Sequence, residues 1–258
     1  MSPFASLLML FMLGLTQAYQ DMYEEIPGDD EETIDITTAI LSTNNGTSEL
    51  LMEGDMLLPN NRNALKCYSN SCLWKKSSNG LVTIPYIISP QFSGMERQKI
   101  EKAIKSFHGR SCIRFVPRRN EYDFISVENK GGCFAALGRQ GGMQVVSLNR
   151  QGCIYHGIIQ HEFLHALGFQ HEQTRSDRDN YVRIIWDNID SEMAFNFYKQ
   201  DTNNMNTPYD YSSIMHYGKT AFTVNGRDTI VPNSGAKIGQ RQGMSRGDVA
   251  RINILYGC

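Results

Sequence analysis

The sequence predicts an α+β fold, in which a mixed β-sheet packs against helices. Four segments have the β-branched, aromatic and alternating character of strands, namely 81–88 (LVTIPYII), 112–117 (CIRFVP), 122–128 (YDFISVE) and 143–149 (MQVVSLN). A helical pattern separates the first two strands, and this order favours a sheet covered by helices. The composition, with 41% hydrophobic and 20% charged residues, is that of a globular protein, and 258 residues suffice for one or two domains.

The first 18 residues have the pattern of a secretory signal peptide. An apolar run from Ala5 to Leu15 precedes the small residue Ala18, which is consistent with cleavage after Ala18. A membrane anchor is the alternative, but the run is too short for a hydrocarbon core of ~30 Å. We therefore expect removal of residues 1–18 and secretion, directly or from storage granules, without membrane attachment.

Residues 19–62 are expected to form a pro-segment. The stretch 21–35 (DMYEEIPGDDEETID) is acidic and turn-rich, which is typical of a segment without its own core. Residues 1–62 hold one Lys or Arg and eleven Asp or Glu, which leaves 24 basic and 16 acidic residues downstream and a net charge of +8. This positive net charge of residues 63–258, the body of the protein, favours acidic partners. The alternative is that the scattered basic residues only keep the surface soluble. Asn45 begins the one N-glycosylation sequon, Asn-Gly-Thr.

The sequence contains six cysteines, an even number that suggests three disulfides in an exported chain. Six cysteines allow fifteen connectivities. None forms a Cys-x-x-Cys pair, which argues against a cysteine zinc site, and Cys67 and Cys72 are near enough to close a local loop. The six are Cys67, Cys72, Cys112, Cys133, Cys153 and Cys258.

A helix is predicted between the first two strands, and another at the end of the chain. Ser93 and Glu96 form a capping box before the first helix, and Ser245 and Asp248 repeat the pattern before the second. The first helix has an apolar stripe made of Ile100, Ala103, Ile104 and Phe107. Residues 174–242 are rich in Asn, Asp, Gly and Tyr and are expected to be irregular.

Three of the six histidines lie within 161–173 (HEFLHALGFQHEQ). On a helix, His161 and His165 stand one turn apart on one face, so that both imidazoles can reach one ion at ~2.0–2.1 Å. Glu162 then points to the neighbouring space in which a metal-bound water would lie. His171 would lie roughly 15 Å further along the axis on a continuous helix, so the chain must turn. Gly168 can adopt a left-handed conformation and allow His171 to swing back.

Three neutral imidazoles with an open fourth direction are typical of a catalytic rather than a structural zinc site. An isolated His-Glu-x-x-His occurs by chance, but the extended pattern also fixes Gly168 and His171. Met215, in the segment SSIMHYG, follows at a plausible distance.

These motifs resemble those of the astacin family, a branch of the metzincin proteases. The continuation His171-Glu172, the SIMHY segment and the cysteine arrangement carry the resemblance, and the segment NALKCYSNSCLW is similar to that of fish hatching enzymes of the high choriolytic type. The resemblance to the astacin family implies a mixed, mostly parallel twisted sheet with two long helices in an N-terminal subdomain. An irregular C-terminal subdomain would follow, with the active-site cleft between the two.

For the site, the resemblance implies one zinc ion on His161, His165 and His171. Glu162 would act as general base, taking a proton from the attacking water and giving it to the departing amine. Tyr217 would be an additional ligand that swings away to stabilise the transition state. Met215 would form an apolar floor beneath the site.

The resemblance also implies activation by a trypsin-like protease after Arg62, which makes Asn63 the first residue of a catalytic domain at 63–258. Glu172 would meet this new N-terminus through water. Without the resemblance, Glu172 is interpreted as a solvated charge.

In the segment LLMEGDMLL, Asp55 matches the aspartate of the Phe-x-Gly-Asp motif in the family's pro-segments. That aspartate occupies the open position of the zinc and keeps the zymogen inactive. Met52 stands where Phe is usual, which changes the packing but not the carboxylate. Without the resemblance, Gly54 and Asp55 indicate only a turn. The implied disulfides are Cys112–Cys258, Cys133–Cys153 and Cys67–Cys72.

We therefore predict a secreted, monomeric zinc endopeptidase that binds extended polypeptides along an edge strand near residues 133–137. Egg-envelope glycoproteins are the expected substrates, and neither nucleic acid nor a membrane is an expected partner. One alternative is an astacin-type protease for other matrix or digestive substrates. Another is a non-catalytic binding or coat protein, against which the intact Glu162 argues.

Overall fold

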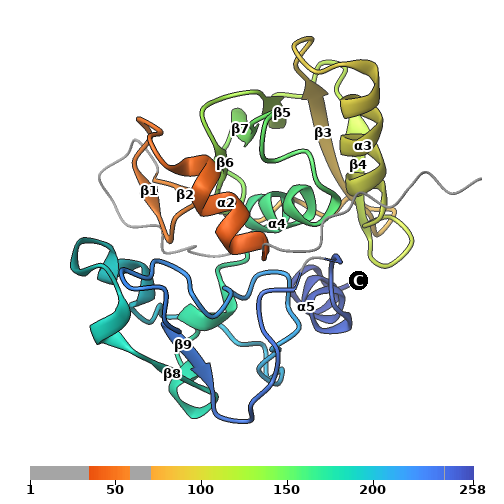
Figure 1. The fold of residues 1–258 in the computed structure, drawn as a ribbon. Coiled ribbons are helices and arrows are strands. Elements are labelled where there is room, and N and C mark those ends of the chain that lie inside the picture. The colour runs from red at the N-terminus through yellow and green to blue at the C-terminus, as the bar shows by residue number, and fades with distance from the viewer. Residues whose placement is uncertain (1–34, 59–70, 241) are drawn as a thin grey trace, which may run out of the picture. The chain divides into compact units, whose positions relative to one another are not determined.

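The computed structural model describes residues 35–58, 71–240 and 242–258 (Figure 1). The predictions for the signal peptide at 1–18, for cleavage between Arg62 and Asn63, and for Cys67 lie outside these residues. No helix within the described ranges is long and apolar enough to cross a membrane.

The first half of the described chain forms a mixed, mostly parallel sheet, as predicted. Its strand order is β1-β2-β6-β7-β5-β3-β4. The pairs β2–β6, β3–β4, β3–β5 and β5–β7 are parallel, whereas β1–β2 and β6–β7 are antiparallel. The strands are β1 (Leu51–Met52), β2 (Met56–Leu57), β3 (Val82–Ile88), β4 (Ile113–Pro117), β5 (Phe124–Glu128), β6 (Cys133–Ala136) and β7 (Met143–Leu148).

The four strands predicted from alternation correspond to β3, β4, β5 and β7. The hairpin of β1 and β2 was not predicted, because strands of two residues are too short to show alternation. Strand β6 lies where the family resemblance places the edge strand for substrate. The β1–β2 hairpin covers that edge, since β2 pairs with β6 through Met56 opposite Ala135 and Leu57 opposite Ala136.

Three helices of the expected body are present, α3 (Gly94–Lys105), α4 (His156–Ala166) and α5 (Arg246–Tyr256). Both predicted capping boxes are formed, at Ser93 and at Ser245. The rings of Phe107, Phe115 and Phe163 pack edge to face, with centroids 5.4 and 5.0 Å apart, and so join the end of α3, strand β4 and α4 in one apolar core. Helix α4 also contacts β6 and β7, which fixes its position on the sheet.

A fourth helix, α2 (Ile36–Asn44), lies within residues 19–62, the predicted pro-segment (Figure 1). Asp35 caps it, because its Oδ1 accepts a hydrogen bond from the Thr38 N–H at 2.9 Å. Ile36 and Ile40 are buried in the same core as α4. Residues 35–44 of the predicted pro-segment therefore contribute apolar side chains to the core, downstream of most of the acidic stretch.

The described residues of the region 174–242 are irregular in the main, as predicted, but they include a small sheet of β8 (Val182–Ile184) and β9 (Ile230–Pro232). The turns η2 (Glu172–Thr174), η3 (Arg178–Asn180), η4 (Trp186–Asn188) and η5 (Ser191–Phe197) are short 3-10 helices. A second apolar cluster, which includes Phe197, Tyr217 and Ile230, holds this region together.

Two disulfides join distant parts of the chain. Cys112, before β4, is bonded to Cys258 after α5, and Cys133, at the start of β6, is bonded to Cys153 before α4. These are pairs that the family resemblance implies. Cys72 is also in a disulfide, whereas Cys67 lies outside the described residues.

Candidate metal centre

The three histidines of the motif converge because α4 stops at Ala166 and the chain reverses. Gly168 has φ +100°, the left-handed conformation expected of it. His171 then lies directly before η2. The Nε2 atom of His161 is 3.1 Å from Nε2 of His165 and 3.2 Å from Nε2 of His171.

The other nitrogen of each ring faces an oxygen acceptor. Nδ1 of His161 lies 2.9 Å from the carbonyl of Ile214, and Nδ1 of His165 lies 2.7 Å from the carbonyl of Phe169. Nδ1 of His171 lies 2.8 Å from a carboxylate oxygen of Glu53. With a metal ion bound, each Nδ1 would carry the hydrogen of a neutral ring and donate it to this oxygen, which would leave the three Nε2 lone pairs for the ion.

This donor set fits a zinc ion. Nitrogens ~2.0–2.1 Å from a tetrahedral ion lie about 3.3 Å apart, close to the observed separations. Asp55 completes the set, since one ligand atom from each of Asp55, His161, His165 and His171 lies within 4.8 Å of every other. Lone pairs and a carboxylate that converge in a buried site repel one another unless a cation or a proton lies between them.

The pKa values of two of these histidines differ. Burial lowers the pKa of His165 to about 4, although the charge of Asp55 opposes the effect. Burial also lowers the pKa of His171, but the charges and hydrogen bonds of Asp55 and Glu53 outweigh it and bring this pKa to about 9. Of the two, His171 is the one that contacts Glu53. Carboxylates that favour a proton on His171 equally favour a cation at its Nε2.

Glu162 lies beside the histidines on α4 and is completely buried. Neither of its carboxylate oxygens has a hydrogen-bond partner within the described ranges. Burial, followed by the negative charge of Asp55, raises its pKa well above the usual value. A buried carboxyl group without partners next to a candidate metal site is suited to holding and transferring a proton.

Asp55 lies in the turn of the β1–β2 hairpin, at the centre of the site. Its Oδ2 is 3.0 Å from Nε2 of His161 and 3.3 Å from Nε2 of His171, and its Oδ1 is 3.3 Å from Nε2 of His165. Despite its burial, the neighbouring histidines hold the pKa of Asp55 well below its usual value. Gly54 makes the turn with φ +81°, and Met52 on β1 is half-buried.

Three glycines downstream of residue 63 leave space for side chains of residues 35–44, which lie in the predicted pro-segment. A Cβ added to Gly132 would overlap the Asn44 side chain, and one added to Gly152 would overlap Thr43. A Cβ added to Gly218 would overlap the carboxylate of Asp35. The Asn44 amide also bonds both backbone groups of Cys133, at 2.8 Å to the carbonyl and 2.7 Å to the N–H.

Tyr217 packs against His171, with ring centroids 4.6 Å apart, and is almost fully buried. Its hydroxyl donates a hydrogen bond to the backbone carbonyl of Glu53. Met215, two residues earlier, is also buried, and its carbonyl accepts from the Glu172 N–H at 3.0 Å. The segment 214–217 thus holds both the histidine cluster and Glu172 in place.

Glu172 is buried rather than solvated, contrary to the interpretation without the family resemblance. Its carboxylate accepts hydrogen bonds from both terminal nitrogens of Arg251, from Arg175 at 3.2 Å and from the Asp210 N–H at 2.7 Å. Its charge is compensated inside the protein, which the isolated sequence does not reveal because Arg251 lies 79 residues away.

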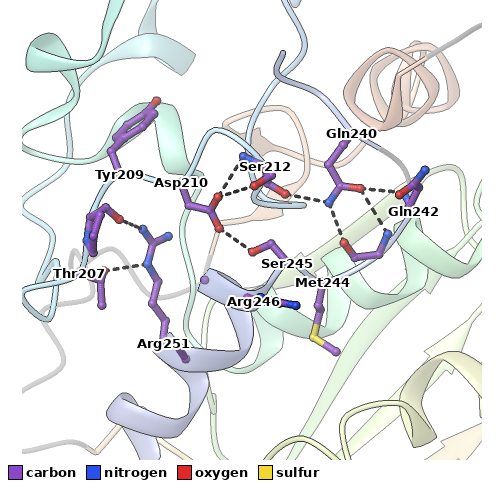
Figure 2. Close-up of a pocket in the computed structure, with 14 residues that line it drawn as sticks. Thr207, Tyr209, Asp210, Ser212, Gln240, Gln242, Met244, Ser245, Arg246 and Arg251 are labelled. Carbon is purple, nitrogen blue, oxygen red and sulfur yellow. Dashed lines mark hydrogen bonds between the residues drawn. The ribbon is translucent and has the colours of Figure 1, made fainter. Parts of the chain in front are cut away.

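A pocket of about 590 Å³ lies beside this ion cluster, and Arg251 forms part of its wall (Figure 2). Asp210 projects into the same region and accepts hydrogen bonds from the hydroxyls of Ser212 and Ser245. Gln240 lies opposite and donates to the carbonyl of Gly243 at 2.7 Å. The pocket is therefore lined by polar groups of several segments close to Glu172.

Glu53 was not among the predicted site residues, although it contacts both His171 and Tyr217. Its neighbours Gly54 and Asp55 match a motif, but no pattern distinguishes this glutamate from the other acidic residues of the pro-segment. Arg175 and Arg251 were not predicted for a similar reason, because the sequence alone does not indicate whether an arginine is buried.

Comparison with known proteins gives consistent matches over the whole chain. The family model Astacin (Peptidase family M12A) matches residues 69–257. High choriolytic enzyme 1 of Oryzias latipes is 59% identical over 267 residues, which cover 100% of this chain and 99% of that protein. Low choriolytic enzyme of the same organism is 48% identical, with 98% of each chain covered.

A solved structure matches as well. It is that of High choriolytic enzyme 1 (HCE-1), a hatching enzyme zinc-protease from Oryzias latipes, with a TM-score of 0.73 and 65% identity. The match covers 76% of this chain and 100% of the solved chain.

Proposed function

The chain belongs to the astacin family of zinc metalloendopeptidases, and from this premise we propose that it is a secreted hatching protease, made as a zymogen, that digests egg-envelope proteins. The observation that carries the proposal is the convergence of three Nε2 atoms, of His161, His165 and His171, beside the unpartnered carboxyl group of Glu162.

The residues of the site have distinct roles in peptide hydrolysis. His161, His165 and His171 would hold a zinc ion, which would supply a bound water with its pKa lowered toward ~7 and polarisation of the substrate carbonyl. Glu162 takes the proton of the attacking water and delivers it to the departing amine. Tyr217, once released from Glu53, donates its hydroxyl hydrogen to the developing oxyanion. Ile214 and Phe169 keep two of the imidazoles in the tautomer that leaves Nε2 free.

Substrate binds as an extended strand at β6 after the β1–β2 hairpin has left. The strand order makes β6 an edge strand once β1 and β2 are removed. The Asn44 amide, which bonds the N–H and the carbonyl of Cys133, indicates two main-chain groups available to an extended peptide. Main-chain pairing would supply affinity, while side-chain pockets would supply selectivity.

We propose that latency comes from Asp55, whose carboxylate oxygens lie 3.0 to 3.3 Å from the Nε2 atoms of the three histidines and would exclude the attacking water. Residues 1–62 are 62 of 258, or 24% of the chain, and the solved hatching enzyme, matched over 100% of its own length, covers 76% of this chain. This agreement supports cleavage between Arg62 and Asn63 by a trypsin-like protease. The new N-terminus would then approach Glu172 through the pocket at Arg251. Asn45 is exposed and accessible to glycosylation in the zymogen.

The egg envelope is proposed as substrate because two relatives are named as choriolytic enzymes and share 59% and 48% of their residues with this chain. The net charge of +8 downstream of residue 62 would favour acidic envelope proteins. Monomeric action and secretion, directly or from storage granules, are part of the same proposal.

The test is an assay of trypsin-treated protein on isolated egg envelope, with casein and gelatin as comparison substrates and with a zinc chelator as control. We expect chelator-sensitive cleavage of the envelope to exceed that of casein and gelatin. Glu162→Gln should retain zinc and lose peptidase activity. Near-normal turnover by zinc-loaded Glu162→Gln would refute the role of Glu162, and preference for casein or gelatin would favour the digestive or matrix alternative.

A further inference from the structure

Glu53 makes two separate contacts with the catalytic machinery. Its side chain, which is fully buried, accepts the Nδ1–H of His171 at 2.8 Å and lies 3.3 Å from the hydroxyl of Thr174. Its backbone carbonyl accepts the hydroxyl hydrogen of Tyr217. Asp55, two residues further on, contacts the opposite nitrogens of the histidines.

The backbone of Glu53 gives an independent reason to assign a role to its side chain. Its φ is +51°, a left-handed conformation that costs a residue with a Cβ about 1 kcal/mol or more and that glycine adopts freely. If the turn alone mattered, glycine would be the better residue at this position, as it is at Gly54. This chain has a glutamate at that position despite the energetic cost, and its carboxylate contacts a proposed zinc ligand.

We propose that Glu53 is a second inhibitory residue of the pro-segment and the outer carboxylate of the metal site in the zymogen. This inference rests on the proposed function. The carboxylate orients His171 and increases the basicity of its Nε2, while the carbonyl keeps the hydroxyl of Tyr217 away from the position of the oxyanion. Removal of the pro-segment takes both contacts away in one cleavage.

Charge balance supports the assignment. Three neutral imidazoles with Asp55 and Glu53 place two negative charges in the buried site, which a divalent cation neutralises. Carboxylates that contact a ligating histidine change metal affinity by about 10- to 100-fold. The zymogen should accordingly hold zinc more tightly than the processed enzyme does.

The experiment compares purified zymogens of the wild type, Glu53→Gln, Glu53→Gly and the control Glu49→Gln. Glu49 is also in the pro-segment but lies outside the site. Zinc affinity is measured by competition with a chromophoric chelator, and basal peptidase activity is measured before trypsin treatment. Since trypsin removes residue 53, all four zymogens should yield the same processed chain, and recovery of its activity checks folding.

We expect both Glu53 variants to bind zinc about tenfold or more weakly and to show raised basal activity, with Glu49→Gln unchanged. If Glu53 served only the turn, Glu53→Gly would relieve the backbone and leave zinc affinity unchanged or lower the basal activity. Either result would overturn the proposal. Failure of the proposed function looks different, because the trypsin-treated wild type would then lack peptidase activity whatever the zinc affinities of the zymogens.

Discussion

Replacing Gly152 with alanine should weaken the hold of the pro-segment while leaving the processed enzyme intact. A Cβ at Gly152 would overlap the hydroxyl of Thr43 and lie 2.9 Å from its Cγ2 and 3.1 Å from its Cβ. Optimal contacts between carbon atoms are about 3.5–4.0 Å, so the side chain of Thr43 or α2 itself would have to shift. The φ of Gly152 is not in the left-handed range, so alanine imposes no backbone strain of that kind.

The size of the effect follows from the cost of overpacking, which is typically about 1–3 kcal/mol. Because the clash exists only when the pro-segment is docked, that cost acts on the docking equilibrium and shifts it by about 5- to 150-fold. Basal activity of the zymogen should rise by the same factor as long as the docked form dominates. The kcat/KM of the trypsin-treated variant should equal that of the wild type.

The matched control is the double variant Gly152→Ala with Thr43→Ala. This second change removes the two nearest atoms of Thr43, whose hydroxyl donates to the carbonyl of Ala39 within α2 at 2.7 Å. Latency should largely return, and Thr43→Ala alone should resemble the wild type. The assay is cleavage of a fluorogenic peptide before and after trypsin treatment. Unchanged basal activity in Gly152→Ala, or the same rise in the double variant, would show that the contact between Gly152 and Thr43 does not hold the pro-segment in place.

Three further predictions concern stability. Arg251→Leu should lower the free energy of unfolding by about 3–5 kcal/mol, measured by urea denaturation, because Glu172 loses its main partner inside the protein; a loss below about 1 kcal/mol would contradict the argument. Burial, with nearby Arg and Lys charges, lowers the pKa of His108, whose Nε2 accepts a backbone N–H of β4. Near this pKa the unfolded chain therefore binds more protons than the folded one, so the free energy of unfolding should fall as the pH drops below about 6.5. In urea titrations at pH values on either side of 6.5, His108→Gln should make this fall smaller. Replacing Cys112 and Cys258 by alanine opens a loop of 146 residues and should cost about 2–5 kcal/mol, seen as a lower Tm; an unchanged Tm would exclude a stabilising role.

The sequence was sufficient wherever a feature depends on neighbouring residues. The helical spacing of His161 and His165, the left-handed Gly168 and the capping box at Ser93 were all predicted, since chain geometry fixes them within a few residues. The strands β3, β4, β5 and β7 were predicted for the same reason. The role of Asp55 came from the family motif rather than from its spacing, and it remains a proposal.

Tertiary structure alone decided which charges are buried and what they contact. Glu53 and Glu172 look like solvated acidic residues in the sequence, but the fold places them against His171 and Arg251, 118 and 79 residues away. The strands of two and three residues, β1, β2, β8 and β9, are likewise defined by distant partners. Short-range periodicity carries no information about such contacts, because the free energy that fixes them comes from burial and hydrogen bonding between segments that the chain brings together only on folding.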